Sequence, residues 1–177
     1  MIALLATCCP KLRRLTIPFM FSESEPFRLL AVYLPRLASL TIKQIDINRS
    51  PPTGIEELGE MAHLTHLDIT INNTVDDTRP FDITFSRLHS LKSVSVVWFR
   101  DWWRDMFFPA PFRPVFFAYL LANNPNLEEA HIELVDLGSP VGDSGTTDLI
   151  KTMFRSRGVR MVERPVVRWP FHDEADE

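Results

Sequence analysis

The stretch Leu37-Ala-Ser-Leu40-Thr-Ile42 contains the pattern that decides the fold of this chain: a leucine, a second leucine three positions later, and an isoleucine two positions beyond that. The same pattern of aliphatic residues recurs four more times, at Leu12-Arg-Arg-Leu15-Thr-Ile17, Leu64-Thr-His-Leu67-Asp-Ile69, Leu91-Lys-Ser-Val94-Ser-Val96 and Leu127-Glu-Glu-Ala130-His-Ile132. The first leucines of the copies, at positions 12, 37, 64, 91 and 127, are separated by 25, 27, 27 and 36 residues. These intervals indicate that one supersecondary unit is repeated along the chain.

Stretches with helical spacing of apolar residues lie between the copies. They cover residues 2–8, 26–34, 54–61, 113–123 and 147–157. Pro10, Pro35 and Pro125 lie two residues before a first leucine, where proline ends a helix and favours extended backbone. Residues 79–88 are compatible with a helix, a 3-10 turn or a loop, and residues 158–162 are expected to form a sixth strand.

The alternation of strands and helices predicts a parallel sheet, because each crossover is long enough to carry a helix. Copies of L-x-x-L-x-L every 20–29 residues are typical of a leucine-rich repeat. We therefore predict an α/β leucine-rich-repeat solenoid of about five to six repeats, with the parallel sheet on the concave side and the helices on the convex side. Residues 1–170 are expected to form this domain, with an aromatic-rich insertion at 98–112, and residues 171–177 an acidic mobile tail.

The composition is that of an ordinary globular domain, with 45% hydrophobic and 24% charged residues among 177. The longest apolar run, residues 115–122, is far shorter than the roughly 18 residues that a membrane span requires, so no membrane partner is expected. The two cysteines, Cys8 and Cys9, are adjacent and give no disulfide framework. Their arrangement favours a reducing compartment, and we expect an intracellular protein, cytoplasmic or nuclear.

The net charge of −4 is distributed unevenly along the chain. Residues 1–50 contain seven basic and three acidic side chains, a balance of +4, whereas residues 101–150 contain two basic and eight acidic ones, a balance of −6. Such asymmetry can orient a charged partner. A nucleic-acid-binding protein would show a stronger basic stripe, so no nucleic-acid partner is expected.

The copy that starts Cys9-Pro-Lys-Leu12-Arg-Arg-Leu15-Thr-Ile17, together with the copies at 34–42 and 124–132, resembles the repeats of F-box/leucine-rich-repeat proteins, particularly the divergent fungal type. The resemblance covers roughly residues 1–165. It implies that the repeats recruit a substrate to a ubiquitin ligase, whose adaptor is bound by a separate F-box in that family. This sequence has no F-box-like segment, so the adaptor is an expected partner only if a longer chain carries an F-box.

Side chains alternate across a strand, so residues between the inward leucines are expected to point to the concave surface. These positions form two predicted columns of polar side chains. We predict that the columns contact another protein, through Arg14, Thr16, Ser39, Thr41, His66, Asp68, Ser93, Ser95, Glu129 and His131. The alternative is that these residues are solvated positions on an open sheet face.

Aromatic residues are concentrated in the longest interval between copies. Ten of the chain's 19 aromatic residues lie between Trp98 and Tyr119. An inserted loop with Trp102 and Trp103 resembles a protein-binding hot spot, which favours tryptophan and arginine, and we predict that these two residues contact the partner. The alternative is that the rings of this segment pack in the core.

Two patterns that suggest chemistry do not support a catalytic or metal site. Residues 142–145, Gly-Asp-Ser-Gly, resemble the nucleophile motif of chymotrypsin-like serine proteases, but no oriented base accompanies Ser144. His63 and His66 are three residues apart, so on a strand they would face opposite sides. We therefore expect no catalytic residue, metal or cofactor. The predicted function is a noncatalytic protein–protein interaction module, the substrate-recognition part of an F-box-type ubiquitin ligase. The alternative is a truncated or scaffold repeat fragment with only a structural role.

Overall fold

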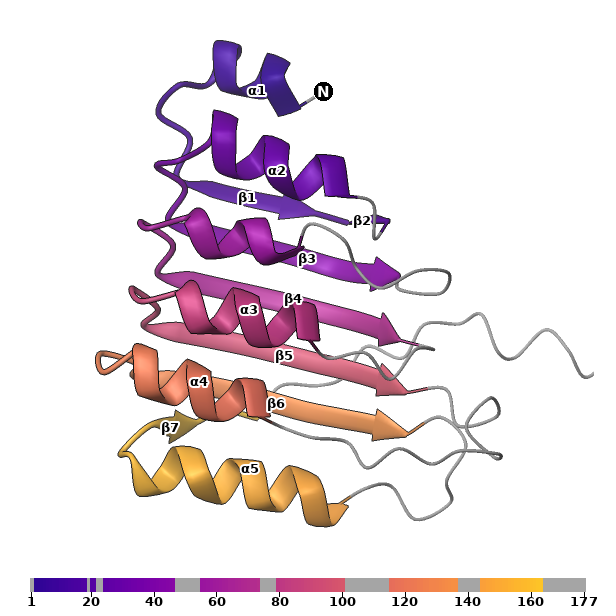
Figure 1. The fold of residues 1–177 in the computed structure, drawn as a ribbon, viewed down its shortest axis with the longest axis vertical. Coiled ribbons are helices and arrows are strands. Elements are labelled where there is room, and N and C mark those ends of the chain that lie inside the picture. Colours follow the sequence, from indigo (N-terminus) through magenta and orange to yellow (C-terminus); the bar gives the residue numbers. More distant parts are fainter. Residues whose placement is uncertain are drawn as a thin grey trace, which may run out of the picture.

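The computed structural model describes residues 2–18, 20–21, 24–46, 55–73, 79–100, 115–136 and 144–163. Helices and strands alternate along most of these residues (Figure 1). The elements in chain order are α1 (Ile2–Cys8), β1 (Arg14–Ile17), β2 (Met20–Phe21), α2 (Ser24–Tyr33), β3 (Ser39–Asp46), the 3-10 helix η1 (Ile55–Glu60), β4 (His66–Asn73), α3 (Arg79–Arg87), β5 (Ser93–Arg100), α4 (Val115–Asn123), β6 (Glu129–Asp136), α5 (Ser144–Ser156) and β7 (Arg160–Met161).

All described strands belong to one parallel sheet, which confirms the predicted pairing. Its order is β1-β3-β4-β5-β6-β7, and the short β2 pairs with β3 beyond the end of β1. The pairing aligns the second aliphatic position of each sequence copy: Leu15 opposite Leu40, Leu40 opposite Leu67, Leu67 opposite Val94, Val94 opposite Ala130 and Ala130 opposite Met161. The five copies and the predicted sixth strand are therefore neighbours in space in the order of the sequence.

The same backbone hydrogen bonds connect one copy to the next. The N–H groups of Ala38 and Ser39 both donate to the carbonyl of Arg13, each at 2.9 Å. The corresponding pairs donate to Ala38, Thr65 and Lys92 in the following copies. Because the same hydrogen bonds form between each copy and the next, each strand pairs with its neighbour in the same register.

The helices stack in one layer along one face of the sheet (Figure 1). The helical patterns predicted the positions of α1, α2, α4 and α5, and residues 79–88, which the sequence left open, contain a true helix, α3. The stretch predicted as helical at 54–61 instead contains the 3-10 helix η1, Ile55–Glu60. Its buried residues Ile55 and Leu58 are three positions apart and Met61 follows after three more, which matches the three residues per turn of a 3-10 helix.

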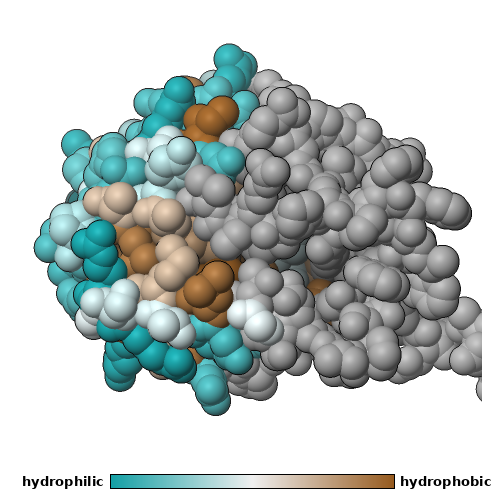
Figure 2. Space-filling view, turned by 60° about the horizontal axis from the view of Figure 1, so that its bottom comes forward, coloured by the Kyte–Doolittle hydropathy of each residue, from teal (hydrophilic) through white to brown (hydrophobic). Residues whose placement is uncertain are grey.

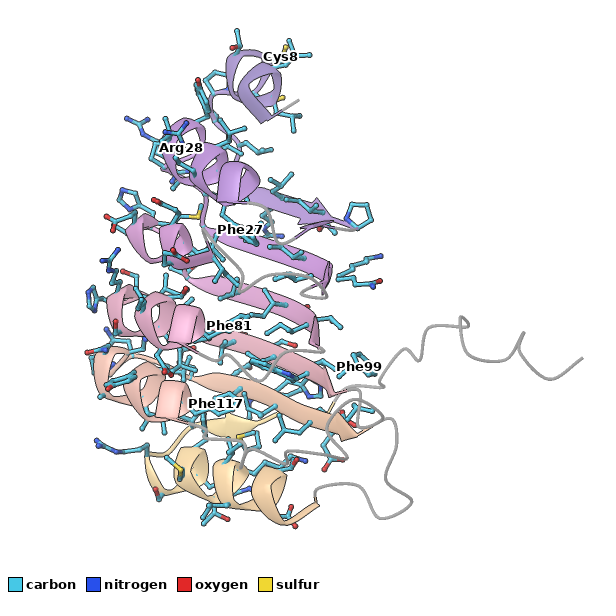
Figure 3. The ribbon with its side chains drawn as sticks, turned by 45° about the vertical axis from the view of Figure 1, so that its right-hand side comes forward. Cys8, Phe27, Arg28, Phe81, Phe99 and Phe117 are labelled. Atoms are coloured by element: carbon cyan, nitrogen blue, oxygen red, sulfur yellow. The ribbon has the colours of Figure 1, made fainter. Side chains whose placement is uncertain are left out.

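The core lies between the helix layer and the sheet. The inward aliphatic residues of the second, third and fourth copies are at most 2% exposed. Phe27, Phe81 and Phe117 extend from successive helices into this layer and are fully buried (Figure 3). The Phe81 ring lies 4.9 Å from that of Trp98 on β5, so the helices and the sheet are joined by aromatic contacts as well as aliphatic ones.

The two ends of the stack are less well covered than its centre. At the first strand, Leu12, Leu15 and Ile17 are only partly buried, although the equivalent residues of the next copy are completely buried. Leu4 on α1 is 67% exposed. At the other end, Figure 2 shows a small group of apolar side chains among hydrophilic ones, and Leu149 on α5 is 58% exposed. Each central strand thus has a neighbouring strand along both edges, whereas a terminal strand has one along a single edge.

Candidate functional site

The predicted polar residues lie on the face of the sheet that points away from the described helices, which we call the outer face. Backbone pairing aligns them in two rows across five strands. One row is Arg14, Ser39, His66, Ser93 and Glu129, and the other is Thr16, Thr41, Asp68, Ser95 and His131. Neighbouring parallel strands are about 4.8 Å apart, so each row extends over roughly 19 Å. The structure thus brings all ten residues onto one surface.

The accessibility of the outer face changes from one end of the rows to the other. Arg14, Thr16 and His66 are exposed, while Ser39, Thr41, Asp68, Ser93 and Glu129 are partly exposed. Ser95 and His131, in contrast, are only 2% and 5% exposed. The surface that a partner can reach is therefore centred on β1, β3 and β4.

His131 is held by neighbouring groups of the chain. Its Nδ1 atom lies 2.8 Å from the carbonyl oxygen of Val162, and its Nε2 atom lies 3.8 Å from a carboxylate oxygen of Glu133. Glu129, two residues before it, forms an ion pair with Arg160 of β7. These contacts occupy the polar groups at the β6 end of the rows, so they are not free for a partner in this conformation.

His66, at the accessible end of the rows, is oriented by the threonine that precedes it. The Thr65 hydroxyl donates to the carbonyl oxygen of Ala38 at 3.0 Å and lies 2.8 Å from Nδ1 of His66. A hydroxyl has one proton, so Nδ1 is the donor in the second contact. The contact thus fixes the orientation of the His66 ring at the start of β4.

A β-bulge adds two polar residues to the outer face that the sequence analysis missed. Ile42 pairs with Ile69 and Ile45 with Ile71, so Lys43 and Gln44 of β3 both lie opposite Thr70 of β4. Lys43 is exposed and Gln44 partly exposed. The sequence contains a sign of this bulge, because two polar residues between two inward isoleucines break the period of two that a regular strand shows.

A basic cluster lies where the chain enters β1 and β3. It consists of Lys11, Arg13, Arg14 and Arg36, all exposed. Nη1 of Arg13 donates to the carbonyl oxygen of Arg36 at 3.1 Å, which places the two residues side by side. None of the four forms an ion pair with another described residue, so their charges are not neutralised within that part of the chain. The basic balance of residues 1–50 is therefore concentrated at one corner of the sheet.

The predicted aromatic contact site is described only at its borders. Trp102 and Trp103 lie outside the described residues, as do the rest of 101–112 and the tail 171–177. At the borders, Trp98 and Phe117 are buried in the core, Phe99 is buried at the end of β5 (Figure 3) and Tyr119 on α4 is exposed. The packing alternative thus applies to Trp98 and Phe117, and the role of the tryptophan pair stays a prediction.

No cluster of three or more His, Cys, Asp and Glu side chains that could hold a metal ion occurs among the described residues. His63 lies in the turn before β4 and His66 at its first position, and both are exposed. Ser144 is the first residue of α5.

Within the described ranges, no helix has the length and apolarity needed to cross a bilayer.

Comparisons of the chain with models of known protein families, with curated proteins and with solved structures find no match.

Proposed function

We propose that the chain is a leucine-rich-repeat solenoid that binds another protein through its outer face, which is the concave side of the solenoid. One observation supports this most strongly: the sequence copies pair in register, so that each adds two polar side chains to the same two rows. Stacked units of this kind characteristically use an extended concave surface for binding.

The accessible residues suit a hydrogen-bonding contact with a peptide or the edge of a domain. Thr16, Ser39 and Thr41 each offer a hydroxyl that both donates and accepts, and Arg14 offers a planar group of donors. We place the contact on seven of the ten predicted residues, because Ser95 and His131 are buried and Glu129 is paired with Arg160. The predicted contribution of Trp102 and Trp103 remains part of the proposal.

The proposed biological role is substrate recognition in an F-box-type ubiquitin ligase, inside the cell. The support for this role is the resemblance of the Cys9–Ile17 copy and its equivalents to F-box/leucine-rich-repeat proteins. The ligase adaptor would be bound only by an F-box in a longer chain. The role requires no catalytic residue, metal or cofactor from this chain.

The experiment compares two variants in a crosslinking and mass-spectrometric search for partners in cells. Thr41→Glu places a larger, negatively charged side chain in the middle of the accessible rows. Ala118→Glu places the same side chain on the exposed side of α4, in the helix layer. We expect Thr41→Glu to lose the partners that the unmodified chain and Ala118→Glu retain. Equal partner sets for both folded variants would contradict binding through the outer face.

A second candidate function is structural: the chain is a fragment whose end docks onto further repeats. The partial exposure of Leu12, Leu15 and Ile17 beside the unprotected Leu4 favours this candidate. Size-exclusion chromatography and thermal melting of the purified chain separate the two. A stable monomer counts against the structural role, whereas aggregation that added repeats relieve would support it.

A further inference from the structure

We infer that the partner segment that binds over β1 and β3 is an extended acidic peptide, with carboxylates that contact Arg14 and Lys43. This inference rests on the proposed function and specifies the chemistry of its partner. It starts from the juxtaposition of the bulge residue Lys43 with the basic cluster at the entry to β1 and β3.

Arg14 and Lys43 occupy the same surface from two neighbouring strands. Arg14 pairs with Ser39, and Lys43 lies four residues further along β3. Four residues of an extended strand cover about 13 Å, and one strand step adds about 4.8 Å sideways, so the Cα atoms of Arg14 and Lys43 are roughly 14 Å apart. An extended peptide spans nearly the same distance between side chains at positions i and i+4.

The residues between the two cations can bind the peptide between its carboxylates. Thr16, Ser39 and Thr41 lie in the interval and are at least partly exposed. Their hydroxyl groups can donate to peptide carbonyls or accept from peptide N–H groups. Small side chains at these positions also leave room for a peptide backbone.

Charge confines the acidic segment to this part of the outer face. Lys11, Arg13 and Arg36 surround the entry to β1 and β3 and add positive potential beside Arg14. The positive potential of these side chains therefore attracts carboxylates to β1 and β3.

The test is fluorescence anisotropy with the full chain and a labelled eight-residue peptide that has Glu at positions 2 and 6 in a Gly/Ser/Thr background. A peptide with Gln at both positions is the uncharged control. The protein variant is Arg14→Glu with Lys43→Glu. Its matched control is Arg155→Glu with Arg157→Glu, which makes the same charge change on exposed residues at the α5 end of the molecule. Circular dichroism confirms that each variant is folded.

We expect the Glu peptide to bind more tightly than the Gln peptide, and its affinity to fall as salt is raised. The Arg14/Lys43 reversal should weaken binding by on the order of tenfold or more, because two attractions become repulsions, while the Arg155/Arg157 reversal changes it less than about twofold. A peptide with Lys at positions 2 and 6 should bind the Arg14/Lys43 variant better than the unmodified chain.

Two results would overturn the inference. One is equal affinity of the Arg14/Lys43 variant and the unmodified chain for the Glu peptide. The other is equally tight binding of an oligothymidylate of matched charge, which would identify a general polyanion surface instead of a peptide site. Either result leaves the proposed function testable by Thr41→Glu. If that variant loses its partners while the Arg14/Lys43 variant keeps them, the outer face binds a protein, but not through an acidic segment.

Discussion

Replacement of Asn124 should destabilise the fold far more than replacement of a neighbouring asparagine. Asn124 follows α4 and is 2% exposed. Its Nδ2 atom donates to the carbonyl oxygens of Leu88 and Leu120, both at 2.9 Å, and its Oδ1 atom accepts from the N–H of Leu91 at 2.8 Å. One side chain thus satisfies buried backbone groups of its own copy and of the preceding one.

The preceding copy needs this support because its entry to the strand is unusual. The first leucine of the other copies donates to the carbonyl three residues earlier, as Leu37 does to Leu34 and Leu127 to Asn124, at 3.0 and 3.1 Å. Leu91 donates to Asn124 instead. Position 89, two residues before Leu91, is histidine, whereas the equivalent positions 35 and 125 are proline. The asparagine side chain takes the place of the turn hydrogen bond.

The cost of losing this side chain can be estimated from the two groups that it leaves unpaired. The N–H of Leu91 and the carbonyl of Leu88 are both buried, whereas the carbonyl of Leu120 keeps a bond from the N–H of Asn124. An unsatisfied buried group costs about 1–3 kcal/mol, so Asn124→Ala should reduce the free energy of unfolding by roughly 3 kcal/mol. For a chain of this size that lowers Tm by about 6–12 °C.

Urea denaturation followed by circular dichroism measures the change. Asn126→Ala is the matched control, because Asn126 is an exposed turn residue, and we expect it to change stability by less than about 0.5 kcal/mol. Asn124→Leu removes the hydrogen bonds but still fills the site with a side chain, since leucine occupies the equivalent positions 34 and 88 in two other copies. It should also destabilise. If Asn124→Leu were as stable as the unmodified chain, the argument from hydrogen bonds would be refuted.

Two further predictions concern packing. A methyl group at Gly59 of η1 would lie 2.7 Å from Cβ of Arg87, so Gly59→Ala should lower the free energy of unfolding by about 1–3 kcal/mol. Gly145→Ala in α5 would meet no described atom within 4 Å and should stabilise by a few tenths of a kcal/mol or more. Equal effects of the two substitutions in thermal melts would contradict the close approach of η1 and α3. Leu40→Ala should lower the free energy of unfolding by about 2–5 kcal/mol because Leu40 is fully buried, and Leu15→Ala should lower it distinctly less because Leu15 is partly exposed. Equal losses in urea titrations would show that the first copy is as well covered as the second.

The parallel sheet and its register were predictable because they depend on residues that the sequence repeats. An aliphatic residue that points into the core must lie opposite another such residue on the neighbouring strand. The positions of Leu15, Leu40 and Leu67 therefore determine which strands pair and in which register. The helix at 79–87 was harder to predict, since its apolar residues Phe81 and Phe85 are few among polar ones. They are nevertheless four residues apart, and both are fully buried.

Features that depend on contacts between distant residues were not predictable. Ser95 and His131 have the same place in the sequence pattern as Thr16 and Thr41, yet they are buried, and nothing in their own copies distinguishes them. Asn124 occupies a position filled by Leu34, Met61 and Leu88 in other copies, and its partners are 33 and 36 residues away. Local periodicity therefore identified the rows of the outer face but not which parts of them are accessible.

Engineered disulfides between β3 and β4 test whether the sequence copies pair in register and so form one polar surface. In a background with Cys8→Ser and Cys9→Ser, Ser39→Cys combined with His66→Cys joins two residues that pair directly. Ser39→Cys combined with Asp68→Cys is offset by two residues, about 8 Å between Cα atoms, beyond the usual 7 Å limit for a disulfide. We expect rapid oxidation of the 39/66 pair in the native protein and little of the 39/68 pair. Preferential closure of the 39/68 pair, or equal rates for both, would contradict pairing of the copies in this register.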